Sequence, residues 1–346
     1  MTGSGKGEAP ETAGGLARHT PVLISEVLSA LQPTDDERYI DCTFGAGGYS
    51  RAILESAKCN VLALDRDPAA ASIASHLARD FPGRFHFAAS PFSALDELSS
   101  QFSFNPADAV IFDLGVSSMQ LDEAERGFSF MRDGPLDMRM SGEGVSAADV
   151  VNSFDEAEIA DILFHLGEER RSRAIAKAIV ARRKDKPFER TLDLASLIES
   201  VMPRRHDDKI HPATRSFQAL RLFVNDELGE IAGALHAAET ILRPGGRLIV
   251  VTFHSLEDRI VKTFLTIRSG GKGRGSRHMP DSGEKRAPSF KLLRRKPVEP
   301  GEEEIRDNPR ARSAKLRAAI RLDAPAWVNK GELATLPGLK LSNLRR

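Results

Sequence analysis

Short apolar runs alternate with amphipathic stretches between residues 38 and 114. The runs are β-branched or aromatic and are bounded by Gly, Pro, Asp or Asn; they fall at Tyr39–Cys42, Val61–Leu64, Arg84–Phe87 and Ala109–Leu114. Helix-like stretches lie between them, around Ser50–Ala57 and Ala69–Asp80. Strands and helices in alternation predict a parallel sheet with helices on both faces.

This rhythm stops in the region 124–210. The region opens with an irregular Gly-rich segment, 126–144, and then continues without a strand pattern. Ser146-x-x-Asp149 and Ser153-x-x-Glu156 match capping boxes at helix starts. Apolar residues then follow at helical spacing, at Ile159, Ile162, Leu163 and Leu166. The pattern predicts an all-helical domain inserted into the α/β domain, and we expect this insert to recognise the substrate.

The α/β pattern resumes after the insert. An apolar stripe from Phe217 to Leu235 predicts one long helix, and the nearly continuous apolar run Arg247–Phe253 predicts an interior parallel strand. A further helix is expected from Leu256 to Ile267, and two final strands at Phe290–Leu293 and Leu316–Leu322. The expected organisation is an α/β domain formed by 19–123 and 211–323, with a disordered tail at 1–18 and a C-terminal tail at 324–346.

Composition places the protein in the cytoplasm. No apolar run is long enough to span a membrane, and the first residues lack the apolar core of a signal peptide. The two cysteines, Cys42 and Cys59, lie in or beside apolar stretches, which indicates a reducing compartment.

Charge adds a possible partner. The formal net charge is zero, but Arg268–Lys296 holds ten Lys or Arg against two acids, and Arg170–Arg190 is a second basic stretch. Clustered positive charge attracts phosphate and favours a nucleic-acid partner. The alternative is a solvated helix face and a flexible loop.

A glycine-rich turn, Asp41–Gly48, joins the first expected strand to the first helix. Glycines there allow a ligand to approach the backbone N–H groups at a helix start. Asp65 ends the second strand and Asp113 the fourth, so both carboxylates are expected in the crevice at the carboxyl edge of the sheet. A tight turn without a ligand is the alternative to a nucleoside cofactor.

The turn favours S-adenosylmethionine over a dinucleotide. The third glycine of the dinucleotide pattern G-x-G-x-x-G is replaced by Ser50. The carboxylate of Asp41 would repel a pyrophosphate, whereas it would attract a cationic sulfonium cofactor with a free amino group.

Nine sequence blocks follow one another along the chain: His19–Leu23, Asp41–Gly48, Ala63–Asp67, Asp113–Ser118, Arg126–Phe130, Gly134–Arg139, His211–Ala213, Phe217–Arg221 and Phe253–Asp258. In these blocks and their order the chain resembles the bacterial ribosomal RNA small-subunit methyltransferase H family. The resemblance covers roughly residues 18–322. The resemblance implies a doubly wound, Rossmann-like class I methyltransferase sheet with the helical insert. It implies methyl transfer from S-adenosylmethionine to the N4 amine of a cytosine in the decoding region of 16S rRNA, within the small ribosomal subunit. It also implies cofactor contacts at Gly47, Gly48, Tyr49, Asp65, Phe92, Asp113 and Gln120. Position 49 is often His in the family, so we expect Tyr49 to contact the cofactor through its backbone.

The chemistry of the residues agrees with transfer to nitrogen. Methylation at C5 of cytosine needs a cysteine nucleophile, and neither Cys42 nor Cys59 is placed for that role. N4 transfer needs an acceptor for the amine proton. His254, at the end of the fifth strand, is the candidate proton acceptor, and Asp113 is a second candidate. The alternative for His254 is a hydrogen-bonded histidine at a strand end.

Two groups are candidates for substrate binding. Asp137 and Arg139 lie in the irregular segment, with a salt-bridged loop as the alternative. Four polar residues share a face of the expected long helix and suit phosphates and base edges: Arg215, Gln218, Arg221 and Asn225.

The sequence also bears on metal binding, on competing functions and on the oligomeric state. No metal is expected, because ligand spacings are absent. A non-enzymatic assembly factor and an NAD-dependent oxidoreductase are the competing functions, and a monomer and a homodimer are both compatible with the sequence.

Overall fold

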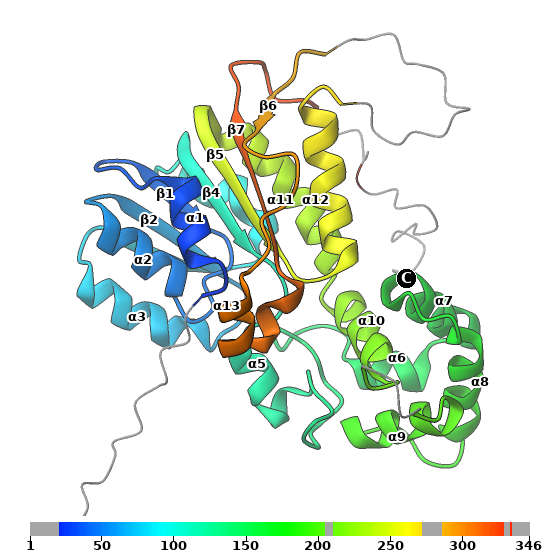
Figure 1. Ribbon diagram of the computed structural model, residues 1–346. Coiled ribbons are helices and arrows are strands. Elements are labelled where there is room, and N and C mark those ends of the chain that lie inside the picture. The colour runs from blue at the N-terminus through cyan, green and yellow to red at the C-terminus, as the bar shows by residue number, and fades with distance from the viewer. Residues whose placement is uncertain (1–20, 205–209, 272–285, 329–332, 334–346) are drawn as a thin grey trace, which may run out of the picture.

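The computed structural model describes residues 21–204, 210–271, 286–328 and 333. A seven-stranded sheet, ordered β3-β2-β1-β4-β5-β7-β6, forms the centre of the α/β domain, and the helical insert lies to one side of it (Figure 1). Five strands are parallel: β1 (Arg38–Asp41), β2 (Asn60–Asp65), β3 (Phe85–Ala89), β4 (Ala107–Asp113) and β5 (Leu242–Thr252). The last two pair antiparallel, β7 (Lys315–Arg321) between β5 and β6 (Phe290–Leu292). The prediction of a doubly wound sheet is confirmed.

Alternate residues of each strand point into two separate apolar layers. In β4, Ala109 and Ile111 join the cluster of α1 (Ile24–Leu31), α2 (Gly48–Ser56) and α3 (Ala70–Asp80). Val110 and Phe112 point to the opposite face, into the cluster of α4 (Leu95–Gln101), α11 (Glu227–Ile241) and α12 (Ser255–Arg268). Burial on both faces explains why the inner strands read as continuous apolar runs.

Regular structure in the described part of 124–210 is helical: α6 (Ala147–Ser153), α7 (Glu156–Gly167), α8 (Ser172–Arg182) and α9 (Thr191–Val201), preceded by α5 (Ser118–Asp122) and η2 (Ala124–Arg126). Ser146 and Asp149 form the expected capping box of α6. The second expected box is wrong. Asp155 and Glu158 cap α7, while the hydroxyl of Ser153 donates to the carbonyl of Asp149 inside α6. The remaining short elements are η1 (Phe92–Ala94), α13 (Glu302–Asp307) and η3 (Pro309–Ser313).

The single long helix expected from Phe217 to Leu235 is two helices. The first, α10 (Thr214–Val224), ends at Asn225, and α11 starts after Asp226, whose φ of +46° is left-handed. α10 packs against α7 and α6, whereas α11 packs against α4 and α12. The packing of the insert therefore extends to residue 224, beyond the boundary expected at 210.

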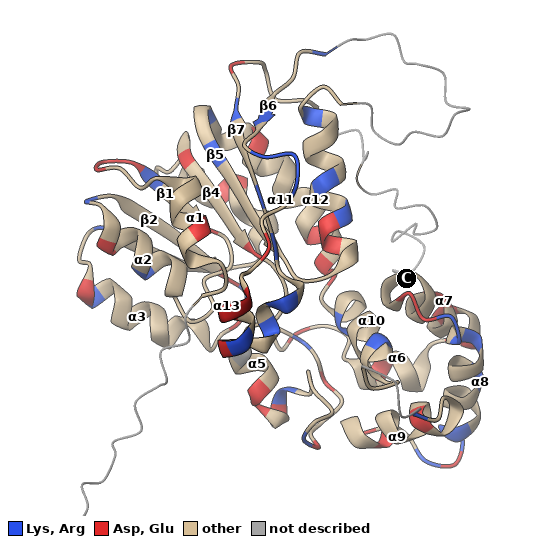
Figure 2. Cartoon of the chain, in the orientation of Figure 1, with Lys and Arg blue, Asp and Glu red and all other residues tan. Residues whose placement is uncertain are grey.

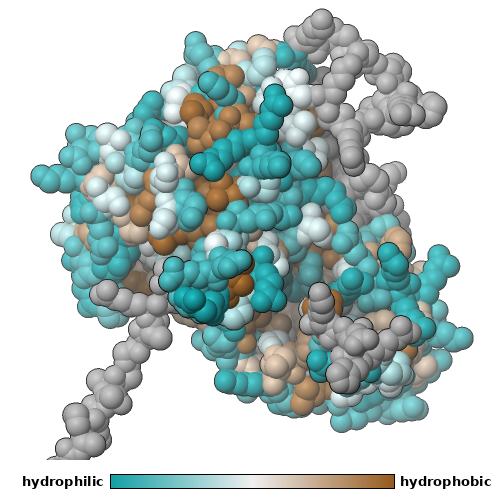
Figure 3. Space-filling view, in the orientation of Figure 1, coloured by the Kyte–Doolittle hydropathy of each residue, from teal (hydrophilic) through white to brown (hydrophobic). Residues whose placement is uncertain are grey.

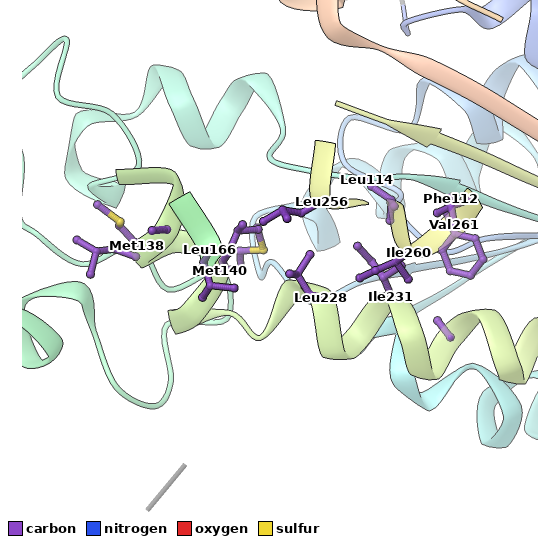
Figure 4. Close-up of a cluster of buried hydrophobic side chains, with 14 of the residues drawn as sticks. Phe112, Leu114, Met138, Met140, Leu166, Leu228, Ile231, Leu256, Ile260 and Val261 are labelled. Carbon is purple, nitrogen blue, oxygen red and sulfur yellow. The ribbon is translucent and has the colours of Figure 1, made fainter. Parts of the chain in front are cut away.

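The insert and the α/β domain share one apolar core (Figure 4). Met138, Met140 and Leu166 on the insert side belong to the same buried cluster as Leu228 and Leu256. Such a continuous core fixes the insert against the carboxyl edge of the sheet. Among the described residues, no helix has the length and apolarity that crossing a membrane requires.

Candidate functional site at the carboxyl edge of the sheet

The glycine-rich turn leads from β1 into α2 at the carboxyl edge of the sheet. Gly47, with φ +77°, precedes α2, and a Cβ added there would lie 2.8 Å from the ring of Phe44. A Cβ on Gly48 would lie 2.2 Å from Cγ of Pro21. Both positions therefore require glycine for packing alone, which is a reason that the sequence did not show.

Asp41 is fully buried below this turn. Its carboxylate accepts hydrogen bonds from the Ser50 hydroxyl at 2.7 Å and from the Thr43 N–H at 3.2 Å. Burial raises the pKa of Asp41 to about 6. The electrostatic argument from the sequence took this carboxylate to face the cofactor, and that premise was wrong, since Asp41 instead supports the turn from inside.

Asp65 lies beside the turn, as expected. Oδ2 accepts from the Gly45 N–H at 2.7 Å and Oδ1 from the Asp67 N–H at 2.8 Å. Burial raises the pKa of Asp65. The carboxylate thus joins the ends of β1 and β2 and keeps lone pairs for a further donor.

Asp113 ends β4 next to the same turn. Its N–H donates to the Thr43 hydroxyl at 2.6 Å, and its Oδ1 is buried without a hydrogen-bond partner among the described residues. Burial, together with the charges of Asp41 and Glu257, raises its pKa well above the ordinary value. A buried acceptor without a partner is costly in a folded protein, which makes this oxygen a candidate binding atom.

The other expected cofactor residues differ in accessibility. The ring of Tyr49 is buried and its hydroxyl donates to the Val22 carbonyl, so only its backbone is available. Phe92 is half-buried and meets Phe112 edge-on at 5.8 Å. The amide of Gln120 is bonded to the Ser117 N–H and to Asp67.

His254 caps α12 and faces Glu257. Its Nδ1 accepts from the Glu257 N–H at 3.4 Å, and its Nε2 lies 3.0 Å from Oε1 of Glu257, at an angle that forms no hydrogen bond. Burial raises the pKa of Glu257, but His254 and Arg221 outweigh it, and the pKa lies below the ordinary value. In this conformation both ring nitrogens of His254 are directed at Glu257.

Arg221 completes this polar cluster. Its guanidinium donates to both oxygens of Glu227, at 2.7 and 2.9 Å, and Glu227, His254 and Glu257 offer ligand atoms within 4.8 Å of one another. A metal ion there would have to displace Arg221 from Glu227. The geometry therefore favours an ion-pair network over a metal centre.

The remaining substrate candidates divide into two groups. Asp137 and Arg139 form a salt bridge at 2.6 Å, and Asn225 is buried, with its side chain bonded to the backbone of 138–140. Arg215 is exposed and Gln218 is half-buried on α10. Arg215 and Gln218 are thus the members of the expected recognition face that remain accessible.

Sequence reasoning missed the connection between the loop after β2 and the insert. Asp67 forms an ion pair with Arg126 at 2.9 Å, and Arg126 also donates to the carbonyls of Arg139 and Met140. Arg126 lay within a recognised block, but its partner is 59 residues away, and nothing in the local pattern pointed to it.

The basic segment that ends at Lys296 does not belong to the group of residues around the glycine-rich turn. Arg294 and Lys296 line a groove between α1 and β7, together with Ser25, Glu26 and Leu316. Apolar surface is exposed beside α1 in this view (Figure 3). Most of the preceding loop, 272–285, is outside the described residues, so the expectation that this loop binds RNA stays a prediction.

The sheet order, the glycine turn and the two strand-end carboxylates together define a class I methyltransferase fold. The model of the MraW methylase family matches residues 16–322, and the chain belongs to this family.

Relatives share most of their length with this chain. A protein of Parvibaculum lavamentivorans named "Ribosomal RNA small subunit methyltransferase H" is 58% identical, over 89% of this chain and 91% of its own. Proteins of the same name from Maricaulis maris and Azorhizobium caulinodans are 56% and 54% identical; the alignments cover 92% and 99% of this chain and 96% and 98% of theirs.

Proposed function

We propose that this protein transfers a methyl group from S-adenosylmethionine to the N4 amine of a cytosine in the decoding region of 16S rRNA, within the small ribosomal subunit in the cytoplasm. The observation that carries the proposal is Oδ1 of Asp113, a buried acceptor without a partner among the described residues, at the edge where the turn, β4 and the insert meet. The names of the relatives supply the RNA class.

The residues at the carboxyl edge of the sheet suit the cofactor. S-Adenosylmethionine, when bound, supplies a methyl group activated by a positively charged sulfur. The first N–H groups of α2 and the free lone pairs of Asp65 suit its polar groups, and the half-buried ring of Phe92 suits its adenine. For Tyr49 a backbone contact is proposed, since its ring is buried. For Gln120 the proposed role is to hold Asp67 and thereby the loop beside Asp65.

Asp113 suits the acceptor that N4 transfer requires. The lone pair of the exocyclic amine is delocalised into the ring, so the enzyme must hold the amine in line with the methyl donor. Oδ1 of Asp113 can accept an amine N–H, and a pKa raised by burial makes this carboxylate a better proton acceptor than an exposed one. His254 is the second candidate, and its ring must first turn away from Glu257.

The cysteines support nitrogen over carbon as the acceptor. Cys42 and Cys59 are both buried, and burial raises the pKa of both thiols. Neither has the accessibility of the nucleophile that C5 methylation requires.

The insert supplies cations for RNA. Arg173 and Lys177 are exposed on α8, where Figure 2 shows blue segments; Arg170 is exposed just before α8, and Arg215 is exposed on α10. For Asp137, Arg139, Arg221 and Asn225 we propose that they shape the RNA site rather than contact RNA, because their polar atoms are bonded inside the protein.

The test is methyl transfer from radiolabelled S-adenosylmethionine to small ribosomal subunits from cells that lack this protein. Label is expected in 16S rRNA and is expected to be released as N4-methylcytidine. Asp113→Ala should abolish transfer, whereas Asp80→Asn, which changes an exposed carboxylate on α3, should not. Cofactor binding without any transfer would contradict the proposed substrate, and the absence of cofactor binding would contradict the enzyme.

A further inference from the structure

Three aromatic rings form a contact group where the insert packs around α10. The ring centroid of Phe130 lies 4.7 Å from that of His211 and 4.8 Å from that of Phe217. Phe217 is buried on α10, whereas Phe130 and His211 are half-buried. Phe130 is therefore in contact with both other rings: the buried ring of Phe217, which fixes it to the core, and the ring of His211, which like Phe130 reaches the surface.

An exposed apolar residue is adjacent in sequence to each of the two half-buried rings: Met131 follows Phe130, and Ile210 precedes His211. Met131 has 83% of its surface exposed and Ile210 has 52%. Single exposed apolar side chains are common, but apolar side chains beside partly exposed rings are typical of a binding surface.

His211 also offers a directed hydrogen-bond donor. Its Nδ1 accepts from the Ala213 N–H at 3.2 Å, which places the ring proton on Nε2. Nε2 has no hydrogen-bond partner within the described part of the chain. A ring face with an N–H at its edge suits a nucleobase, which offers a π-face and acceptor atoms in one plane.

We propose that Phe130 and His211 form a stacking site for the base of an unpaired nucleotide that flanks the methylated one. The proposal rests on the proposed function. Phe217 precedes Arg221 by about one turn of α10, about 6 Å along the axis, so the stack lies near the polar cluster that contains Arg221 and Glu257. Arg215, exposed four residues after His211, supplies a cation for the adjoining phosphate.

The test compares the RNA affinity of two ring variants with that of a cation variant. Phe130→Leu keeps apolar volume, and His211→Asn keeps an acceptor for the Ala213 N–H. Each is expected to weaken binding of the subunit about fivefold to a hundredfold, as the loss of one stacked base does. The slope of log affinity against log salt should stay unchanged, because stacking releases no counterions. Arg215→Ser should instead reduce that slope by about one.

Further measurements keep the result decisive. Both ring variants should keep wild-type cofactor affinity and unfolding temperature, which excludes a folding defect. In an oligonucleotide with an abasic nucleotide beside the target cytosine, wild type and Phe130→Leu should bind equally. Unchanged affinity of both variants, or a loss confined to intact subunits and absent with naked RNA, would overturn the stacking site; the second result would indicate a ribosomal protein as the partner. Failure of the wild type to methylate RNA would instead contradict the proposed function.

Discussion

The side chain of Asn225 accepts a hydrogen bond from the backbone N–H of Met140 at 2.8 Å, across 85 residues of sequence. The side-chain amide nitrogen of Asn225 donates to the Met138 carbonyl at 2.7 Å, and the backbone carbonyl of Asn225 accepts from the Arg66 guanidinium at 2.8 Å. One residue at the break between α10 and α11 therefore joins the irregular segment of the insert to the loop that follows Asp65.

Asn225→Asp should weaken the connection between the irregular segment of the insert and the loop that follows Asp65, because a carboxylate cannot donate to the Met138 carbonyl. We expect the free energy of unfolding to fall by about 1–3 kcal/mol and the KM for RNA to rise, measured by urea unfolding and by methyl transfer. Asn152→Asp is the matched control. Asn152 bonds both backbone groups of Phe188 inside the insert, so it should cost similar stability and leave KM closer to wild type. Equal KM changes in both variants would argue against the connection.

The ion pair of Asp67 and Arg126 should act as a second connection. Their side chains are 8% and 22% exposed, and removing one partner leaves a mostly buried charge, which costs about 3 kcal/mol or more. Arg126→Met should therefore be destabilising, and adding Asp67→Asn should recover part of the loss. Urea unfolding of both single variants and the double variant measures this coupling. Strictly additive losses would show that the pair is energetically independent.

Gly48→Ala should destabilise the protein through Pro21 and not through the cofactor. The added Cβ would lie 2.2 Å from Cγ of Pro21, and such overpacking costs about 1–3 kcal/mol. Pro21→Ala removes that Cγ, so the double variant should regain stability in thermal unfolding without cofactor. Gly233→Ala is the control: no atom lies within 4 Å of its added Cβ in α11, and alanine should stabilise that helix slightly. A double variant as unstable as Gly48→Ala would exclude Pro21 as the cause.

Asp41 should make stability fall as pH rises. Its pKa is about 6 in the folded protein against an ordinary value of 3.8, so the unfolded chain releases this proton at lower pH than the folded one. The penalty is absent below about pH 4, grows up to about pH 6, and amounts to roughly 3 kcal/mol above it. Asp41→Asn removes this titration and keeps an acceptor for Ser50. The stability of the variant relative to wild type, from urea unfolding at several pH values, should rise across that window. A constant difference would contradict the assignment.

The sequence predicted much of the α/β domain, because burial on both faces leaves a direct pattern. The seven strands lie within a few residues of their expected positions, apart from the earlier start of β5 at Leu242. Asp65 and Asp113 could be placed because parallel strands end at one edge of the sheet.

The errors fall where contacts distant in sequence determine local structure. No Gly or Pro stands at the break between α10 and α11. Asn225 and Asp226 nevertheless leave the helix, because Met138, Met140 and Arg66 provide hydrogen-bond partners for Asn225. The burial of Asp41 depends likewise on Ser50 in the next helix. The segment assigned as a C-terminal tail from 324 also makes contacts, because the N–H of Trp327 donates to the buried carboxylate of Glu239.

The position of β7 in the sheet has a consequence for folding during translation. β7 lies between β5 and β6, although it is synthesised after both. While the chain is still being translated, the outer edge of β5 has no neighbour, and β6 has no strand to pair with until Lys315–Arg321 has emerged. Open edges promote association with other chains. A nascent chain that stops before residue 315 therefore exposes the unpaired edge of β5, which can pair with other chains. The sheet can be completed only after translation has passed residue 321.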